Sequence, residues 1–512
     1  MVCGLDNQSL IVKMKNKNIM IKNFKWLLLV SLTFAACSDD DNEDVVAPVA
    51  ITSGEADFSN YVALGDSFAA GFSDNALFVE GQKNAYTNIL AQQFMLAGGG
   101  EFSTPFMSDN IGGFNSGGVQ IPQFGPRLYL NTVITPEHPS QTPDPVAGIS
   151  GTSITDHLTG PFNNMGVPGA KSFHLVTPGY GTLNPYFGRF ASSATATVIG
   201  DAVAQDPSFF SLWIGGNDVL SYATSGGIGT NQTGNPNPAT YGGNDITDPN
   251  VFAATYTALV DNLTTNGAKG VVANLPYINA LPFFTTVPYN PIPLDAQTVA
   301  VLSGASGYGQ YNGGLQLAVS LGALTAEEAA RRTITFHVGA GNAVVIVDSY
   351  LTNLTTLGIP SYRQATAEDL VVLPARNFIG TMVNGNPMAV NGVSVPLADN
   401  WVLSKNEIAE VKTATDAYNA TIESIAAAKG LAFVNTKAIM DQLLNGGLVR
   451  NGYTLNTTYV TGGTFSLDGV HPSPRGYALI ANFFAEAINL KYGSNLPGVS
   501  MANYRILYPK DL

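Results

Sequence analysis

The chain is organised around residues 61–71, which read YVALGDSFAAG. A short, mostly apolar run leads into a Gly-Asp-Ser turn, and small residues follow. This pattern, with a helical pattern downstream at 85–96, is typical of the first strand of a parallel α/β sheet. Ligands bind beyond the carboxyl ends of the strands in such sheets, and Ser67 is expected there. Gly-Asp-Ser is also a common turn sequence, so this stretch alone does not predict catalysis.

Three further blocks follow in order: residues 164–169 read NMGVPG, residues 211–218 read SLWIGGND and residues 468–472 read DGVHP. Together with the first block they resemble the four motifs of the GDSL or SGNH hydrolase family. The first block departs from the family pattern only at Phe68, where leucine is usual. Alternation of strands and helices along the chain predicts a three-layer α/β/α sandwich with about five parallel strands, flavodoxin-like in its layering. The resemblance implies the same fold and a serine esterase or lipase.

The four blocks supply the residue types that acyl transfer needs. A serine is a weak nucleophile until a base takes its proton, so Ser67 is the predicted nucleophile and His471 the predicted base. Asp468 is expected to orient the imidazole and to stabilise its protonated form. The alternative for His471 is a solvated loop histidine that caps the following helix. The remaining histidines show no paired metal-ligand spacing, so neither a metal nor another cofactor is predicted.

The resemblance also implies an oxyanion hole made of the Ser67 amide, the Gly169 amide and the Asn217 side chain. Glycine suits position 169 if a backbone donor must approach the substrate where no Cβ intrudes. Asn217 has an alternative role as an Asx turn at the end of a strand. Asp218 is expected to structure that turn rather than to react.

Composition bounds the classes of function. The chain has 512 residues, of which 45% are apolar and 12% charged, as in a globular protein. Its formal net charge of −14 argues against nucleic acid as a partner, because phosphate binding needs clustered lysine and arginine. An ester substrate, on a lipid or an acylated glycan, is the expected partner. The sequence does not indicate an oligomeric state.

The N-terminus predicts secretion. Residues 22–36 have a basic start, an apolar run too short to span a membrane, and small residues directly before Cys37. This resembles the lipobox of bacterial lipoproteins, although Phe34 replaces the usual leucine. We therefore predict that residues 1–36 are removed and that Cys37 is lipidated; an ordinary cleaved signal or a buried helix is the alternative. Loss of Cys3 leaves no cysteine pair, so no internal disulfide is expected.

Residues 37–56 form an acidic tether, rich in aspartate, after the predicted lipid anchor. The tether resembles the acidic tails that send some lipoproteins to the outer face of the outer membrane. The expected location is therefore the bacterial outer membrane, with the protein exposed at the cell surface. The alternative is that the tether is only a solvated spacer and carries no targeting signal.

The hydrolase domain is predicted at 57–512, with an inserted subdomain at about 280–400 that carries a helix at 325–332 and a strand at 343–347. The α/β pattern resumes with a helix at 405–429, closed by Gly430. The insertion is expected over or beside Ser67. Its apolar segments 281–284 and 287–289 either line an acyl pocket, which favours lipid esters, or form the core of the insertion. The predicted function is that of a lipid-anchored serine esterase that acts through an acyl-enzyme and favours acyl or lipid esters. The alternatives are a carbohydrate O-acetyl esterase acting on polysaccharides and a non-catalytic surface-binding lipoprotein.

Overall fold

The computed structural model describes residues 50–135 and 140–512. Residues Ile51–Leu512 form one compact unit. The predicted signal segment, the lipidated Cys37 and most of the tether lie outside the described residues and stay predictions. Within the described part of the chain, no helix combines the length and the apolar character that crossing a membrane requires.

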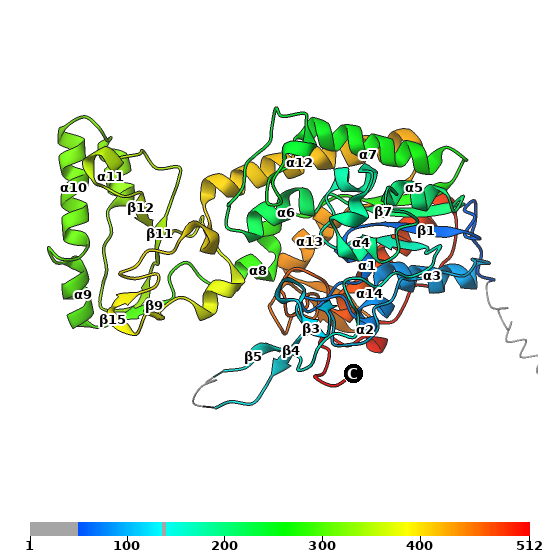
Figure 1. Ribbon diagram of the computed structural model, residues 1–512, viewed down its shortest axis with the longest axis horizontal. Coiled ribbons are helices and arrows are strands. Elements are labelled where there is room, and N and C mark those ends of the chain that lie inside the picture. The colour runs from blue at the N-terminus through cyan, green and yellow to red at the C-terminus, as the bar shows by residue number, and fades with distance from the viewer. Residues whose placement is uncertain (1–49, 136–139) are drawn as a thin grey trace, which may run out of the picture. The chain divides into compact units, whose positions relative to one another are not determined.

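A five-stranded parallel sheet forms the centre of the unit (Figure 1), in the order β17-β8-β7-β1-β6. Its strands are β1 (Tyr61–Gly65), β6 (Asn164–Gly166), β7 (Phe209–Trp213), β8 (Lys269–Ala273) and β17 (Ala432–Val434). Every residue of β1 and β7 is buried, as expected of strands covered on both faces. The predicted α/β fold with about five parallel strands is confirmed.

Helices cover both faces of the sheet (Figure 1). On one side α7 (Pro249–Thr264) packs against α12 (Lys405–Lys429), and on the other α3 (Tyr86–Leu96) packs against α14 (Pro474–Tyr492). Helix α12 begins at a capping box of Ser404 and Glu407 and ends at Gly430, whose φ of 64° is left-handed. The helix predicted at 405–429 and its end at Gly430 are therefore confirmed. Short helices α2 (Val79–Lys83), α4 (Pro185–Gly188), α5 (Val198–Val203) and α13 (Thr436–Leu444) complete the layers.

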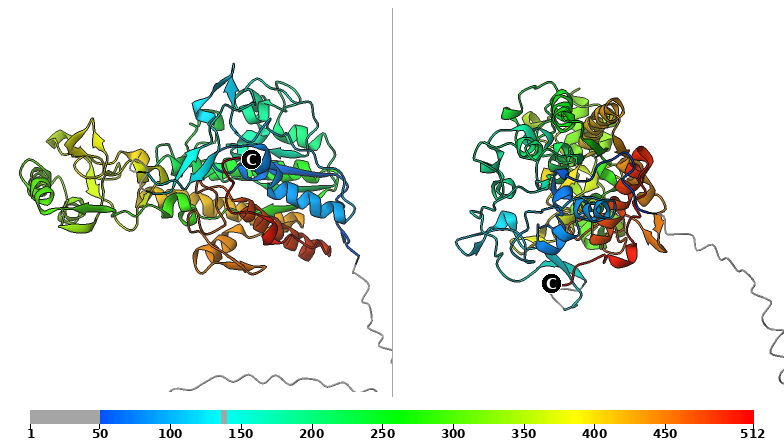
Figure 2. Two further views of the ribbon diagram at one scale, coloured as in Figure 1. Left: turned by 90° about the horizontal axis from the view of Figure 1, so that it is seen from below. Right: turned by 90° about the vertical axis from the view of Figure 1, so that its right-hand side faces the viewer.

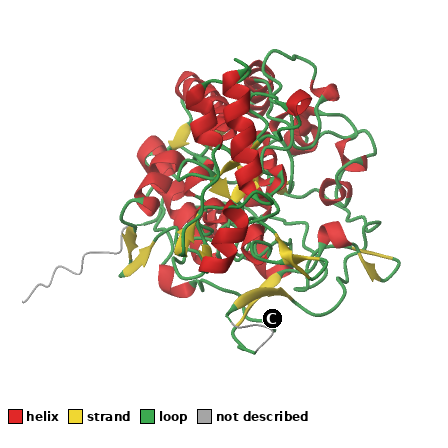
Figure 3. Ribbon diagram, turned by 90° about the vertical axis from the view of Figure 1, so that its left-hand side faces the viewer, coloured by secondary structure: helices red, strands yellow, loops and turns green. Residues whose placement is uncertain are grey.

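Loops make up much of the unit, as the green segments of Figure 3 show. The stretch 98–160 holds two small antiparallel hairpins among its described residues, β2 (Asn115–Ser116) with β3 (Val119–Gln120) and β4 (Leu128–Asn131) with β5 (Thr142–Pro145). Another hairpin, β18 (Leu448–Arg450) with β19 (Tyr453–Leu455), precedes the last motif.

Between β8 and α12 the chain adds an insertion that falls in the same compact unit. Its helices are α8 (Pro282–Thr285), α9 (Ala296–Ser303), α10 (Tyr308–Ser320) and α11 (Ala326–Arg332). Its short strands are β9 (Ile292–Leu294), β10 (Gly339–Asn342), β11 (Val345–Val347), β12 (Tyr362–Gln364), β13 (Leu370–Val371), β14 (Met382–Val383), β15 (Asn386–Val390) and β16 (Val402–Leu403). The sequence predicted the helix and the strand that correspond to α11 and β11, but not α9 or α10.

The insertion has two regions with different surroundings. Helices α9, α10 and α11 lie with β9, β11, β12 and β15 at one end of the unit, away from the central sheet (Figures 1 and 2). Helices α10 and α11 share a small core of their own, made of Leu315, Ala318, Leu324, Ala329, Leu354 and Ile359. Helix α8, in contrast, reaches the last motif, because the Phe283 amide donates to the Gly469 carbonyl at 2.9 Å. Only the near part of the insertion therefore contacts the loop that carries His471.

Candidate active site

Ser67 lies directly beyond the carboxyl end of β1, as the sequence predicted. It is the first residue of the short helix α1 (Ser67–Ala70), whose cap is Asp66. An Asp66 carboxylate oxygen accepts a hydrogen bond from the Phe68 amide at 3.0 Å, which fixes the turn. Burial raises the pKa of Asp66 to about 7, although that hydrogen bond acts in the opposite direction.

His471 and Asp468 meet Ser67 in one chain of hydrogen bonds. The Nε2 atom of His471 lies 2.8 Å from the Ser67 Oγ, across a sequence separation of 404 residues. The Nδ1 atom lies 2.9 Å from an Asp468 carboxylate oxygen. The structure thus brings together the three side chains that the sequence assigned to a triad, in the order nucleophile, base and acid.

Asp468 is held as a carboxylate by four donors. One oxygen accepts from the backbone amides of Val470 at 2.9 Å and His471 at 2.8 Å, and the other accepts from the His471 ring and from the Asn75 amide at 3.0 Å. Burial acts to raise the pKa of Asp468, but the charge of His471 and these hydrogen bonds outweigh it and lower the pKa. The group is therefore ionised at neutral pH, where it can stabilise a protonated imidazole.

A segment that the sequence analysis missed holds the His471 loop against α1. The Ser73 hydroxyl donates to the Pro472 carbonyl at 3.0 Å, and an Asp74 carboxylate oxygen accepts from the Leu467 amide at 2.8 Å. Asp74 and Asn75 have φ values of 49° and 67°, in the left-handed region that aspartate and asparagine tolerate better than most residues. The Asp-Asn pair shortly after the serine motif is a sequence signal for a turn, and it could have indicated this segment.

Aromatic rings flank the imidazole. The ring centroids of Phe68 and Phe72 lie 5.3 Å and 4.6 Å from that of His471. Both phenylalanines are half-buried. These contacts restrict the motion of the imidazole, and Phe72 was not singled out from the sequence.

The three predicted oxyanion donors lie at the ends of three adjacent strands. Strand β1 pairs with β6 through Gly65 and Gly166 and with β7 through Gly65 and Trp213, so Ser67, Gly169 and Asn217 follow the same edge of the sheet. The Asn217 side chain donates to the Ala170 carbonyl at 3.0 Å, which ties the second and third motifs together. One N–H of this amide remains for a substrate oxygen.

Gly169 is exposed, and its backbone adds a reason for glycine. A Cβ at this position would meet no protein atom within 4 Å, but the residue has a φ of 77°. The left-handed backbone therefore favours glycine here, and the close approach of a substrate to this amide stays a prediction.

Asp218 structures the turn beside Asn217, as expected. Its carboxylate is buried and accepts from the Ser172 amide at 2.8 Å and from the Ser172 hydroxyl at 2.7 Å. The neighbouring Lys171 is also buried, and its ammonium group donates to the Asp245 carbonyl. These contacts fix the segment that follows Gly169.

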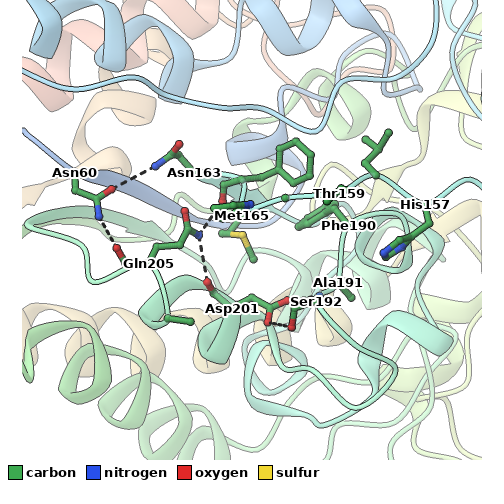
Figure 4. Close-up of a pocket in the computed structure, with 15 residues that line it drawn as sticks. Asn60, His157, Thr159, Asn163, Met165, Phe190, Ala191, Ser192, Asp201 and Gln205 are labelled. Atoms are coloured by element: carbon green, nitrogen blue, oxygen red, sulfur yellow. Dashed lines mark hydrogen bonds between the residues drawn. The ribbon is translucent and has the colours of Figure 1, made fainter.

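A cavity of about 250 Å³ lies beside the predicted triad, with Asp468 and Phe283 in its wall. A different cavity, of about 600 Å³, lies near the starts of β1 and β6, where Asn60 and Asn163 are found (Figure 4). Its polar side chains bond mainly to one another or to the backbone; the Ser192 hydroxyl, for example, donates to Asp201. This second cavity is at the opposite end of the strands from Ser67, and no serine among its described lining residues is bonded to a histidine.

Among residues 50–135 and 140–512, no three histidine, cysteine or acidic side chains are grouped so that they could hold a metal ion. The expected absence of a cofactor stays a prediction.

Comparison with known proteins identifies the family. A family model described as GDSL-like Lipase/Acylhydrolase matches residues 61–484. Among solved structures, the acetylxylan esterase Axe2 from Geobacillus stearothermophilus is 12% identical, with 86% of this chain and 98% of that chain covered and a TM-score of 0.31. The extracellular lipase from Streptomyces rimosus is also 12% identical, with 84% and 99% covered and a TM-score of 0.28. No curated protein matches the sequence.

Proposed function

This chain belongs to the GDSL-like lipase/acylhydrolase family and is a serine ester hydrolase, and we propose that Ser67, His471 and Asp468 carry out the reaction on esters with a short acyl group. The observation that carries the proposal is the continuous hydrogen-bonded chain from the Ser67 hydroxyl through the His471 ring to the Asp468 carboxylate. A protein that only binds a ligand has no need of this arrangement, which argues against the non-catalytic alternative.

The geometry supports a two-step mechanism. The Ser67 Oγ attacks the ester carbonyl while the His471 Nε2 takes its proton, and the ionised Asp468 stabilises the imidazolium. The oxygen of the tetrahedral intermediate accepts hydrogen bonds from the Ser67 and Gly169 amides and from the Asn217 side chain. His471 then returns the proton to the departing alcohol. Water hydrolyses the acyl-enzyme by the same steps in reverse, which releases the carboxylic acid and frees Ser67.

The packing of the insertion supports a short acyl group. Leu281, Phe284 and Val287, which were candidates for an acyl pocket, are buried at 5%, 2% and 7% exposure and belong to the hydrophobic core. Phe283 and Tyr289 are half-buried, and Phe283 lines the cavity of about 250 Å³ beside Asp468. A carbohydrate O-acetyl esterase fits these features better than a lipase for long chains, so the second hypothesis from the sequence is preferred.

A series of p-nitrophenyl esters from acetate to palmitate tests the acyl preference. We expect kcat/KM to fall from the short esters to the long ones. If the series instead rises by the roughly 0.8 kcal/mol that each buried methylene contributes, the short-acyl proposal is wrong. Phe283→Ala is the informative variant, and Phe284→Ala is its matched control, because loss of the buried ring should reduce stability rather than change the chain-length profile.

A fluorophosphonate probe tests the nucleophile separately. Wild-type protein should be labelled and Ser67→Ala should not be. Equal labelling of the two proteins would exclude Ser67 as the nucleophile.

We also propose that the mature protein is a lipoprotein, anchored through Cys37 in the bacterial outer membrane and exposed at the cell surface. The support is the signal-like segment before Cys37 and the acidic residues that follow it. External protease added to intact cells tests the location. Digestion should occur without lysis, whereas protection in intact cells with loss in lysed cells would exclude surface exposure.

A further inference from the structure

Two adjoining hollows lie beside the loop that carries Asp468 and His471. The first, of about 250 Å³, has Asp468 in its wall, and the second has a volume of about 980 Å³. Both are lined by Arg376 and Tyr459, so the hollows adjoin at these residues. We call them together the Arg376 groove. The larger hollow is at the upper end of the range for ligand pockets and exceeds what a short acyl group needs.

Three segments far apart in the sequence build the Arg376 groove. They are the hairpin of β4 and β5, the insertion at 283–293 and 373–380, and the loop at 457–461. Two hydrogen bonds tie these walls to the loop that carries His471. The Tyr459 hydroxyl donates to the Leu467 carbonyl at 2.6 Å, and the Phe283 amide donates to the Gly469 carbonyl at 2.9 Å. A molecule in the groove is therefore held at a fixed place relative to the predicted triad.

The lining is rich in hydroxyl and amide groups. Described residues of this kind are Thr142, Thr285, Thr286, Thr457, Thr458, Thr461, Ser140, Gln141, Asn75 and Asn377. Among the described lining residues the one carboxylate is Asp468, and it is already bonded to His471. The described part of the lining is therefore poor in negative charge, although the chain has a net charge of −14.

Arg376 is the cation of this lining. It belongs to the short helix η7 (Leu373–Asn377), is exposed, and forms no hydrogen bond or ion pair with any described residue. Other arginines of the insertion are paired: Arg363 with Asp348 and Asp369, and Arg331 with Glu327. An unpaired guanidinium presents a planar set of donors that matches a carboxylate or a sulfate.

The loop at 457–461 adds an independent indication of a ligand site. Val460, between two residues of the lining, has a φ of 66°, which is a genuine outlier for a β-branched residue. The loop is held in this conformation by Asn456, whose side chain accepts from the Thr458 amide at 2.9 Å and whose amide donates to the Gly462 carbonyl at 2.9 Å. Backbone strain that the surrounding structure maintains is found preferentially at functional sites.

We infer that the Arg376 groove binds the alcohol portion of the ester substrate and that this portion is an anionic saccharide whose carboxylate or sulfate pairs with Arg376. The inference rests on the proposed ester hydrolysis at Ser67 and names its substrate class. Many hydroxyl groups in the wall suit a polyhydroxylated ligand, and a neutral sugar or a fatty acyl chain would have no use for the unpaired guanidinium.

Acetate release from two oligosaccharides tests the inference. O-acetylated oligogalacturonate carries carboxylates, and O-acetylated oligogalactan of the same length does not. We expect wild-type protein to prefer the acidic substrate, and Arg376→Gln to lower kcat/KM for it about tenfold to a hundredfold, mainly through KM, relative to p-nitrophenyl acetate. Arg376→Lys should keep part of the preference, and added salt should weaken it. Arg331→Gln, an exposed arginine outside the groove, is the matched control and should change nothing.

Equal rates on the two oligosaccharides, or equal losses on both in Arg376→Gln, would overturn the inference. The inference would also be overturned if p-nitrophenyl palmitate were cleaved faster than p-nitrophenyl acetate and Arg376→Gln left both rates unchanged. The groove would then hold an acyl chain. A sulfated O-acetylated galactan shows which anion is preferred.

Calorimetric binding of unacetylated oligogalacturonate to Ser67→Ala separates this inference from the proposed function. Binding that Arg376→Gln removes supports the groove even if no ester is cleaved. Cleavage of p-nitrophenyl acetate with no such binding keeps the esterase and rejects the groove.

Discussion

Replacing Asp468 with asparagine tests the role of the acid with almost no change in shape. Each carboxylate oxygen of Asp468 accepts hydrogen bonds from two N–H donors. In the asparagine variant, the side-chain N–H₂ replaces one of these oxygens and therefore faces two groups that are themselves donors. If the N–H₂ faces the His471 ring, the imidazole must offer a lone pair at Nδ1 and carry its proton at Nε2. That proton would point at the Ser67 Oγ, and the ring could no longer act as a base.

If the N–H₂ faces the other way, it opposes the backbone amides of Val470 and His471 and leaves both donors unsatisfied, whereas the first orientation opposes one backbone amide, that of Asn75. An unsatisfied buried donor costs about 1–3 kcal/mol, so this orientation is the less stable one. The tautomer that disables His471 is therefore expected to dominate. In a serine protease triad the same change lowers kcat about 10⁴-fold, which corresponds to about 5.5 kcal/mol of transition-state stabilisation.

The assay is hydrolysis of p-nitrophenyl acetate by wild type and Asp468→Asn, with thermal unfolding measured on the same samples. We expect kcat to fall about 10⁴-fold while the protein stays folded. Activity within tenfold of wild type in a folded variant would refute the reasoning, because it would mean that Asp468 does not set the tautomer of His471.

Ser67→Ala and His471→Ala should each cost about as much activity as the double variant, because nucleophile and base act as a unit; additive losses in kcat would contradict this. Asn217→Ala should lower kcat about 10²–10³-fold with little change in KM, since its donor acts on the oxyanion, and a change confined to KM would exclude that role. Burial raises the pKa of Asp74 to about 7, above its unfolded value near 4, so its contribution to stability is present below pH 4 and is lost as the pH rises through 7. The stability of Asp74→Asn relative to wild type should therefore increase by about 1–4 kcal/mol between pH 5 and pH 8, as measured by thermal unfolding. A stability difference between the two proteins that stays constant across that range would show that the Asp74 carboxyl does not titrate there. Cys37→Ser should move the protein from the membrane fraction to the soluble fraction with unchanged specific activity, and continued membrane association would contradict lipidation at Cys37.

The central sheet and the residues at its edge could be predicted from the sequence. A strand buried on both faces needs a mostly apolar run, so β1 and β7 could be recognised from their residue pattern. The turn at Ser67 and the ends of α12 have local signals, because caps and glycines act within a few residues. Helix α10 shows where such signals fail, since its three glycines disfavour a helix that tertiary packing nevertheless stabilises.

The contacts that hold these residues, and the surfaces beside them, became visible only in the folded structure. The hydrogen bonds from Asp74 and Asn75 to the His471 loop span 392 or 393 residues, and no local pattern encodes a contact at that distance in the chain. The Arg376 groove joins three segments that have no motif in common, and an arginine in a sequence does not reveal whether it has a partner. Local sequence thus determines backbone geometry and the reactive groups, whereas substrate contacts depend on packing between distant segments, because burial and charge pairing exist only once the chain has folded.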